Sequence, residues 1–188
     1  MAPLNVPNFL TVVRILLVPV LVVALLDKTS GGDLLAAIVF AVASLTDAID
    51  GYLARARNWV TTFGKLMDPI ADKLLIVAAL IALVSLGRLA AWVAMVIICR
   101  EFAVTVLRVA AGAGQGVVIS ASVLGKLKTA VQVAMVMVLI AVHRHGHPLW
   151  VSLLVYVTVL VTVLSGADYF FGASRGRVEP SPTAGVDP

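Results

Sequence analysis

Length, composition and charge place this chain outside the class of ordinary soluble domains. Its 188 residues are 61% hydrophobic and 13% charged, with a mean hydropathy of +1.08, whereas a soluble domain is about half apolar and a quarter charged. The net charge of +4 does not indicate nucleic-acid binding, because the Lys and Arg residues lie between apolar runs, and the single Cys99 excludes an internal disulfide.

Six apolar stretches follow one another along the chain. A helix needs about 20 mainly apolar residues to span a membrane, and each stretch is long enough when helices with charged ends are admitted. Turn-forming residues separate the stretches, for example at Gly112–Gly116 after the fourth. The pattern predicts an all-α integral membrane fold of six transmembrane helices, at approximately 9–26, 34–56, 65–87, 90–111, 120–142 and 148–170.

The chain ends and the basic residues predict an orientation. No Lys or Arg precedes the first apolar stretch, so we expect that helix to be retained and not removed as a signal peptide. Most basic residues lie near the second and fourth breaks and after the last helix, which by the positive-inside rule places both termini in the cytoplasm. We expect one domain in the cell inner membrane over residues 1–173, with segment 2–8 along the interface, and a disordered tail over residues 174–188.

Four aspartates stand at the ends of the second and third apolar stretches. Asp47 and Asp50 are three residues apart and Asp68 and Asp72 four, so each pair projects from one face of a helix. An ionised carboxylate costs about 2.5–3.5 kcal/mol at the centre of a membrane helix, and four together repel one another. Two divalent cations, Mg²⁺ or Mn²⁺, are the simplest solution, and two-metal sites suit displacement at phosphorus.

The same aspartates could instead have a purely structural role, as helix caps or as partners of basic neighbours at the membrane surface. Those neighbours are Arg55, Arg57, Lys65 and Lys73. Small residues, Gly51 and Ala54 beside Asp50 and Gly64 before Asp68, would let a ligand approach the backbone, although small residues also mediate ordinary packing of membrane helices.

Together these residues form the pattern Asp47-x-x-Asp50-Gly51-x-x-Ala54-Arg55, eight residues, then Gly64-x-x-x-Asp68-x-x-x-Asp72. The pattern resembles the signature of the CDP-alcohol phosphatidyltransferase family at every position. The resemblance implies a six-helix membrane fold with a polar cavity open to the cytoplasm. It also implies a reaction in which an alcohol oxygen attacks the β-phosphorus of a CDP-lipid and CMP leaves.

The resemblance also assigns roles to the residues of the pattern. All four aspartates would be associated with the metal ions, and Asp72 would also accept the proton of the attacking hydroxyl. Gly51, Ala54 and Arg55 match positions that bind the cytidine nucleotide, and Gly64 would belong to the same CDP-lipid site. For Arg55 the alternative is a charge that snorkels to the membrane surface.

Outside the signature, up to about residue 172, the chain most resembles the bacterial phosphatidylglycerophosphate synthases of that family. The resemblance rests on Pro7-Asn8-x-Leu10-Thr11-x-x-Arg14, Asp68-Pro69-x-Ala71-Asp72-Lys73, Arg100-Glu101, Leu107-Arg108 and Gly125-Lys126-x-Lys128-Thr129. These pieces hold more cations than one diphosphate with metals requires, which favours an acceptor that carries its own phosphate, such as glycerol 3-phosphate. The candidate phosphate ligands are Arg100 and Lys126, followed by Arg14, Arg108, Lys128 and Lys73.

Arg100 follows a long apolar run, and an arginine within a membrane helix is usually functional or paired. Glu101 is adjacent in sequence but points about 100° away on a helix, so a direct ion pair between the two is not expected. For Arg108 and Lys128, positive-inside topology accounts for the charge equally well.

Two other functions compete with this interpretation. A cardiolipin synthase of the same family would accept phosphatidylglycerol and need fewer cations at the acceptor site. A divalent-ion transporter would use intramembrane aspartates as its path, but these four gather at one end of two helices.

The expected partners are CDP-diacylglycerol, the acceptor and membrane lipids, with no nucleic acid, and a homodimer by analogy with the family. His143, His145 and His147 are expected on the side away from the cytoplasm without a catalytic role, and Asp168 has no assigned role.

Overall fold

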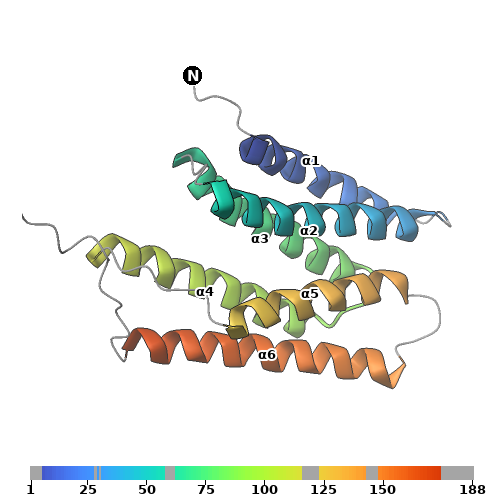
Figure 1. Ribbon diagram of the computed structural model, residues 1–188. Coiled ribbons are helices and arrows are strands. Elements are labelled where there is room, and N and C mark those ends of the chain that lie inside the picture. The colour runs from blue at the N-terminus through green and yellow to red at the C-terminus, as the bar shows by residue number, and fades with distance from the viewer. Residues whose placement is uncertain are drawn as a thin grey trace, which may run out of the picture.

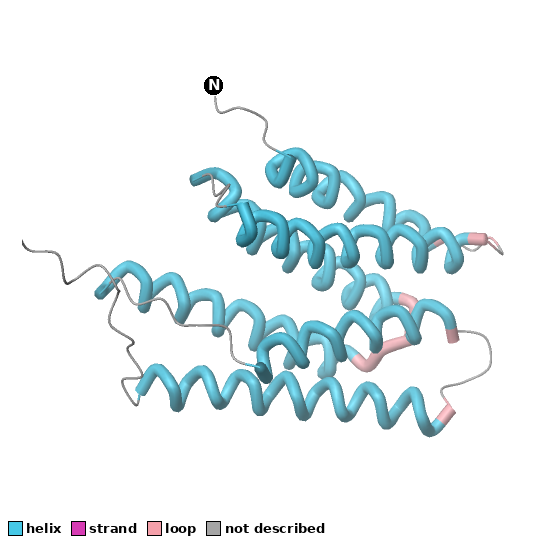
Figure 2. Tube along the Cα trace, viewed as in Figure 1, coloured by secondary structure: helices cyan, strands magenta, loops and turns pink. Residues whose placement is uncertain are grey.

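Six α-helices make up the regular structure of the described residues in this computed structural model (Figures 1 and 2). They are α1 (Val6–Leu26), α2 (Gly32–Arg57), α3 (Thr62–Ser85), α4 (Ala91–Gln115), α5 (Val123–Ala141) and α6 (Leu149–Ser174). The structure describes the backbone of residues 6–27, 29, 31–57, 62–115, 123–142 and 148–174, and within them the side chains of 11–27, 29, 31–46, 73–107, 125, 127–142 and 148–168. The predicted all-α architecture is confirmed over these residues.

Five of the six helices, α1, α2, α3, α4 and α6, extend beyond their predicted bounds at one end or both. α1 begins at Val6, inside the segment that was expected along the interface, and α4 continues to Gln115 through the break expected at Gly112–Gly116. In α4 the alanines at positions 110, 111 and 113 are strong helix formers, which offsets the glycines between them. α6 ends at Ser174, one residue into the predicted tail, and residues 175–188 lie outside the described part.

The helices pack as two groups of three (Figure 1). α1 lies against both α2 and α3, α6 lies against both α4 and α5, and α5 also contacts α2, which joins the two groups. Successive helices run in alternate directions. The C-terminal ends of α1, α3 and α5 therefore lie at the same end of the bundle as the N-terminal ends of α2, α4 and α6 (Figure 1).

The interior and the exterior of the bundle are both apolar. Leu21, Phe40, Leu80 and Met135 are fully buried in a core to which all six helices contribute. Large apolar side chains also cover the outside. Those more than 60% exposed are Leu16, Val23, Leu34, Leu45, Met95, Val106, Leu149 and Leu153. Soluble monomers rarely expose such extensive apolar surface, whereas lipid tails are as apolar as leucine, so this exterior suits a lipid environment.

By length and composition, one helical stretch among the described residues, Leu149–Asp168 of α6, is long and apolar enough to cross a membrane. Shorter apolar stretches within the same residues are Thr11–Leu26, Gly32–Thr46, Lys73–Ser85 and Leu127–Ala141. The structure thus supports one clear spanning candidate, and the expectation of six transmembrane helices stays a prediction.

α3 ends in a turn that requires a glycine. Gly87 has a φ of 70°, in the left-handed region. The Gly87 amide donates to the Val84 carbonyl and the Arg88 amide to the Leu83 carbonyl, both at 2.9 Å, which is the Schellman pattern of a helix C-terminus. Arg88 Nη1 then donates to Asp33 Oδ1 at 2.6 Å. This ion pair ties the end of α3 to the first turn of α2.

Gly87→Ala is therefore expected to destabilise the protein. A side chain in the left-handed conformation costs about 1–2 kcal/mol, so the variant should unfold at a lower temperature than the wild type in a thermal melt of the detergent-purified protein. Gly31→Ala is the matched control, because a Cβ there meets nothing within 4 Å. Equal melting temperatures for wild type and Gly87→Ala would show that this turn does not need its left-handed glycine.

Candidate active site

The four signature aspartates lie on two consecutive helices. Asp47 and Asp50 fall within about the last three turns of α2, and Asp68 and Asp72 within about the first three turns of α3. Both pairs therefore lie toward the end of the bundle where α2 ends and α3 begins (Figure 1). Among the described residues α2 and α3 make few direct contacts with each other, and α1 packs against both.

The side chains of the signature lie outside the described residues. This holds for the four aspartates and for Gly51, Ala54, Arg55 and Gly64. The side chains that the structure does describe contain no group of three or more His, Cys, Asp or Glu residues suited to a metal ion. The metal site and the CDP-lipid site thus stay predictions. The non-catalytic assignment of His143, His145 and His147 also stays a prediction, because these residues fall outside the described part.

A cluster of buried polar side chains lies between α4, α5 and α6. At its centre Glu101 of α4, only 8% exposed, accepts hydrogen bonds at one oxygen, Oε1, from Lys128 Nζ of α5 and from Arg100 Nη1 at 3.3 Å. Arg100 Nη2 donates to Ser165 Oγ of α6 at 2.6 Å. We call Arg100, Glu101, Lys128 and Ser165 the Glu101 cluster. It ties three helices together through charged groups.

The ion pair between Arg100 and Glu101 corrects the prediction that these neighbours would not meet. The two side chains do leave α4 in different directions, but arginine is long enough to return. Its stem passes close to α6 at Gly166, where an added Cβ would lie 3.2 Å from Arg100 Cγ. The absence of a side chain at Gly166 leaves this path open, and the guanidinium then reaches both Ser165 and Glu101.

Further buried polar groups extend the cluster along the same helices. One turn after Lys128 on α5, Gln132 Nε2 donates to Thr162 Oγ1 of α6 at 3.3 Å. On α4, Thr105 Oγ1 donates to the carbonyl of Glu101 at 2.7 Å. Sequence reasoning missed Gln132, Thr162 and Ser165, although a signal was present. Lys128 and Gln132 are four residues apart, and Thr162 and Ser165 three, which is the spacing of a polar stripe on an apolar helix.

The charges of the Glu101 cluster do not balance among the described side chains. Two cations, Arg100 and Lys128, share one carboxylate, so these described side chains carry one more formal positive charge than negative in a largely buried place. Lys73 of α3 lies within electrostatic range of Lys128 and adds to the positive field. Arg100 Nε is buried and has no hydrogen-bond partner among the described residues. Because burying an uncompensated charge is costly, such an arrangement suits a site that receives an anion.

Some of the other predicted phosphate ligands have described side chains and some do not. Arg14 of α1 is 2% exposed and lies one turn after Thr11, which is also buried. Lys128 is buried and ion-paired, so positive-inside topology alone does not account for it. The side chains of Lys126 and Arg108 lie outside the described residues. Of the six predicted ligands, the structure brings Arg100 and Lys128 onto the same carboxylate.

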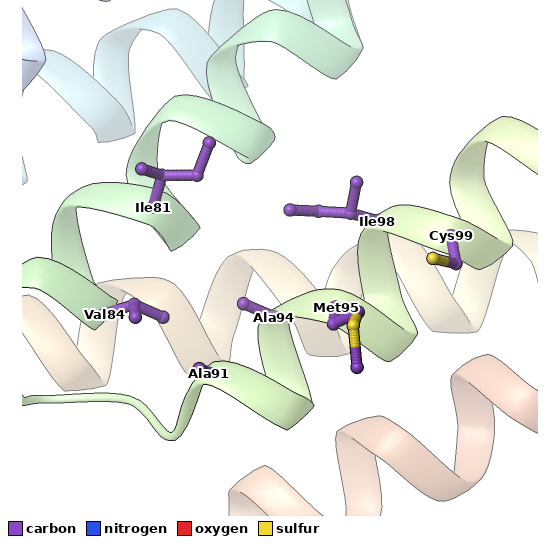
Figure 3. Close-up of a pocket in the computed structure, with 7 residues that line it drawn as sticks. All are labelled: Ile81, Val84, Ala91, Ala94, Met95, Ile98 and Cys99. Carbon is purple, nitrogen blue, oxygen red and sulfur yellow. The ribbon is translucent and has the colours of Figure 1, made fainter.

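An apolar groove lies between α3 and α4 (Figure 3). It has a volume of about 310 Å³ and is lined by side chains such as Ile81, Val84, Met95 and Ile98, with the thiol of Cys99 at one end. Among the described residues that line it, that thiol is the one ionisable group. The described walls therefore hold no cationic group that could bind a phosphate.

Comparison with known proteins identifies the family. The family model for CDP-alcohol phosphatidyltransferases matches residues 4–164, so the chain belongs to the CDP-alcohol phosphatidyltransferase family, a class of membrane-associated enzymes. The predicted family resemblance is confirmed.

Individual relatives cover nearly the same length. The chain is 44% identical over 184 residues to the CDP-diacylglycerol–glycerol-3-phosphate 3-phosphatidyltransferase of Bacillus subtilis (strain 168), covering 88% of this chain and 93% of the relative. It is 44% identical over 176 residues to the "Probable phosphatidylglycerophosphate synthase" of Mycobacterium tuberculosis (strain CDC 1551 / Oshkosh), covering 91% and 82%. A CDP-diacylglycerol–glycerol-3-phosphate 3-phosphatidyltransferase of Rickettsia felis is 35% identical over 170 residues, covering 88% and 93%.

Proposed function

We propose that this chain transfers the phosphatidyl group of CDP-diacylglycerol to sn-glycerol 3-phosphate, giving phosphatidylglycerophosphate and CMP. The observation that carries the choice of acceptor is the Glu101 cluster, in which two buried cations share one carboxylate. An acceptor with its own phosphate would balance the excess positive charge that these described side chains carry. The names of relatives that match at 44% and 35% identity over most of the chain support the same reaction.

The proposal includes six transmembrane helices in the cell inner membrane, with both termini and the polar cavity on the cytoplasmic side. The apolar exterior of the bundle supports a lipid environment. Because the six helices alternate in direction, the start of α1 and the end of α6 lie at the same end of the bundle, which supports placing both termini on one side (Figure 1). Lys and Arg residues are concentrated near the α2–α3 and α4–α5 junctions, in the flanking helix ends, and after α6, which supports this orientation.

Asp47, Asp50, Asp68 and Asp72 are the residues that would hold two divalent cations in this proposal. A set of carboxylate oxygens fits Mg²⁺ or Mn²⁺, which prefer hard oxygen ligands. When bound, such cations supply charge neutralisation at the diphosphate. Gly51, Ala54 and Gly64 would leave room for the CDP-lipid beside them, and Arg55 would face its phosphate.

The chain's own side chains supply the remaining chemistry. In the proposed step the hydroxyl oxygen of glycerol 3-phosphate forms a bond to the β-phosphorus, and the bond from that phosphorus to the CMP oxygen breaks with its electron pair going to CMP. The hydroxyl proton goes to the Asp72 carboxylate, which acts as general base. Arg100 and Lys128 would hold the acceptor phosphate by charge-assisted hydrogen bonds, with Arg14, Lys73, Arg108 and Lys126 as further candidates.

The test is CMP release from CDP-diacylglycerol by the purified chain in detergent. We expect turnover with glycerol 3-phosphate and Mg²⁺ or Mn²⁺, none after EDTA, and recovery when metal is restored. Phosphatidylglycerol, inositol phosphate and serine serve as alternative acceptors. Turnover with phosphatidylglycerol instead would identify a cardiolipin synthase, and no CMP release with any acceptor would contradict the proposed reaction.

A further inference from the structure

Glu101 is a buried carboxylate that the reaction itself does not use. It lies outside the aspartate signature of residues 47–72, and its negative charge would not attract an anionic substrate. It nevertheless receives two cations at one atom, because Arg100 Nη1 and Lys128 Nζ both donate to Oε1. These cations come from α4 and α5, and Lys128 and Glu101 are 27 residues apart in the chain. A carboxylate buried between two cations from two helices therefore calls for a functional explanation.

We propose that Glu101 is a positioning residue, which holds Arg100 and Lys128 at a fixed separation and orientation so that both face the phosphate of the acceptor. The proposal rests on the proposed function, because it assumes that these two cations bind the acceptor phosphate. It adds a residue that touches no substrate and acts through its neighbours.

The hydrogen bonds of the cluster support this role. A guanidinium has five N–H donors and an ammonium three. Among the described residues, Arg100 uses one donor on Nη1 and one on Nη2, and its Nε donates to none. Lys128 Nζ donates to Glu101. The contact with Glu101 thus fixes each cation while leaving donors on both for a phosphate.

The charge of Glu101 has a second effect when the site is empty. Two cations that lie close together in a buried place repel each other, and both belong to long side chains with many rotamers. The shared carboxylate offsets the repulsion, and Ser165 of α6 fixes the other end of the guanidinium. The site is then organised before the acceptor arrives, which lowers the cost of binding it.

Simple electrostatics and positioning predict opposite results for Glu101→Gln. The substitution keeps the shape of the side chain and removes its negative charge. If Glu101 only weakened the positive field, the variant would bind the acceptor phosphate more tightly and the KM for glycerol 3-phosphate would fall. If Glu101 positions the two cations, they separate in the variant and this KM rises.

The experiment measures kcat and both KM values of Glu101→Gln in detergent with CDP-diacylglycerol and glycerol 3-phosphate. We expect the KM for glycerol 3-phosphate to rise by about tenfold or more, as when one member of a buried charge group is lost. The KM for CDP-diacylglycerol should stay within about twofold. The matched control is Asp33→Asn, which removes the carboxylate of the Arg88 ion pair at another junction and should leave the KM for glycerol 3-phosphate unchanged.

A second variant guards against loss of folding. Glu101→Asp keeps the charge but withdraws the carboxylate by one methylene, so it should raise the KM for glycerol 3-phosphate less than Glu101→Gln does. If a thermal melt shows that Glu101→Gln is unfolded, the KM of Glu101→Asp for glycerol 3-phosphate is used as the test instead. An unchanged or lowered KM for glycerol 3-phosphate in the folded variant overturns the role of Glu101. Failure of the wild type to use glycerol 3-phosphate overturns the proposed function instead, and the positioning role with it.

Discussion

Asp72→Asn is expected to reduce kcat by about a thousandfold or more, since a general base alone contributes about 10²–10⁴. Asparagine keeps the size of the side chain but can neither accept the hydroxyl proton nor contribute negative charge to a cation site. CMP release from CDP-diacylglycerol with saturating glycerol 3-phosphate is the measurement. Asp168→Asn is the control, because it makes the same change at an exposed position of α6, and it should retain wild-type activity.

The metal dependence of Asp72→Asn separates its two proposed roles. If Asp72 served only as a metal ligand, raising the concentration of Mg²⁺ or Mn²⁺ would restore most of the activity. A loss of proton acceptance is not restored in this way, so we expect kcat to stay low at saturating metal. Activity above about a tenth of the wild-type value would contradict a base role, given the usual size of that effect.

Arg100→Met is expected to raise the KM for glycerol 3-phosphate by about 30-fold or more. Removing one partner of a buried, hydrogen-bonded charge group costs about 2–5 kcal/mol, and about 1.4 kcal/mol corresponds to a factor of ten. The methionine keeps an apolar stem along α6 at Gly166 but cannot reach Glu101 or Ser165. Steady-state kinetics with each substrate varied in turn are the measurement.

Two further variants show what the guanidinium of Arg100 contributes. Arg100→Lys keeps the charge without the planar fork, so it should fall between wild type and Arg100→Met. Arg88→Met is the control. Arg88, at the α3–α4 turn, also forms a partly buried ion pair, and its partner is Asp33 of α2. That control should lower the melting temperature and leave KM unchanged. A rise in the KM for CDP-diacylglycerol alone in Arg100→Met would move Arg100 from the acceptor site to the CDP-lipid site.

The sequence was sufficient for the elements and the family. Apolar runs of about 20 residues have few alternatives to helices in a chain of this composition, and the predicted stretches agree with α1 to α6 within a few residues. The four aspartates belong to one local pattern over two consecutive helices, from Asp47 to Asp72. A local pattern of that kind can be recognised without knowing how distant segments pack, which is why the family could be predicted from it.

Helix ends were predicted less well than helix existence. Glycines at 112 and 114 predicted a break, yet α4 runs on to Gln115, because a single glycine costs a helix only about 1 kcal/mol. Gly87, in contrast, ends α3 as predicted, since its left-handed φ and the two turn hydrogen bonds leave no room for a further helical turn.

The sequence alone thus determined the helices and the aspartate signature of residues 47–72, because each depends on residues that are close together in the chain. Only the tertiary structure brought Arg100, Glu101, Lys128 and Ser165 into one cluster, in which the cations Arg100 and Lys128 share one carboxylate oxygen. Ser165 is 65 residues from Arg100, and Lys128 is 27 residues from Glu101. Contacts over such separations depend on which helix faces pack together, and neither helical periodicity nor neighbouring position in the chain specifies that.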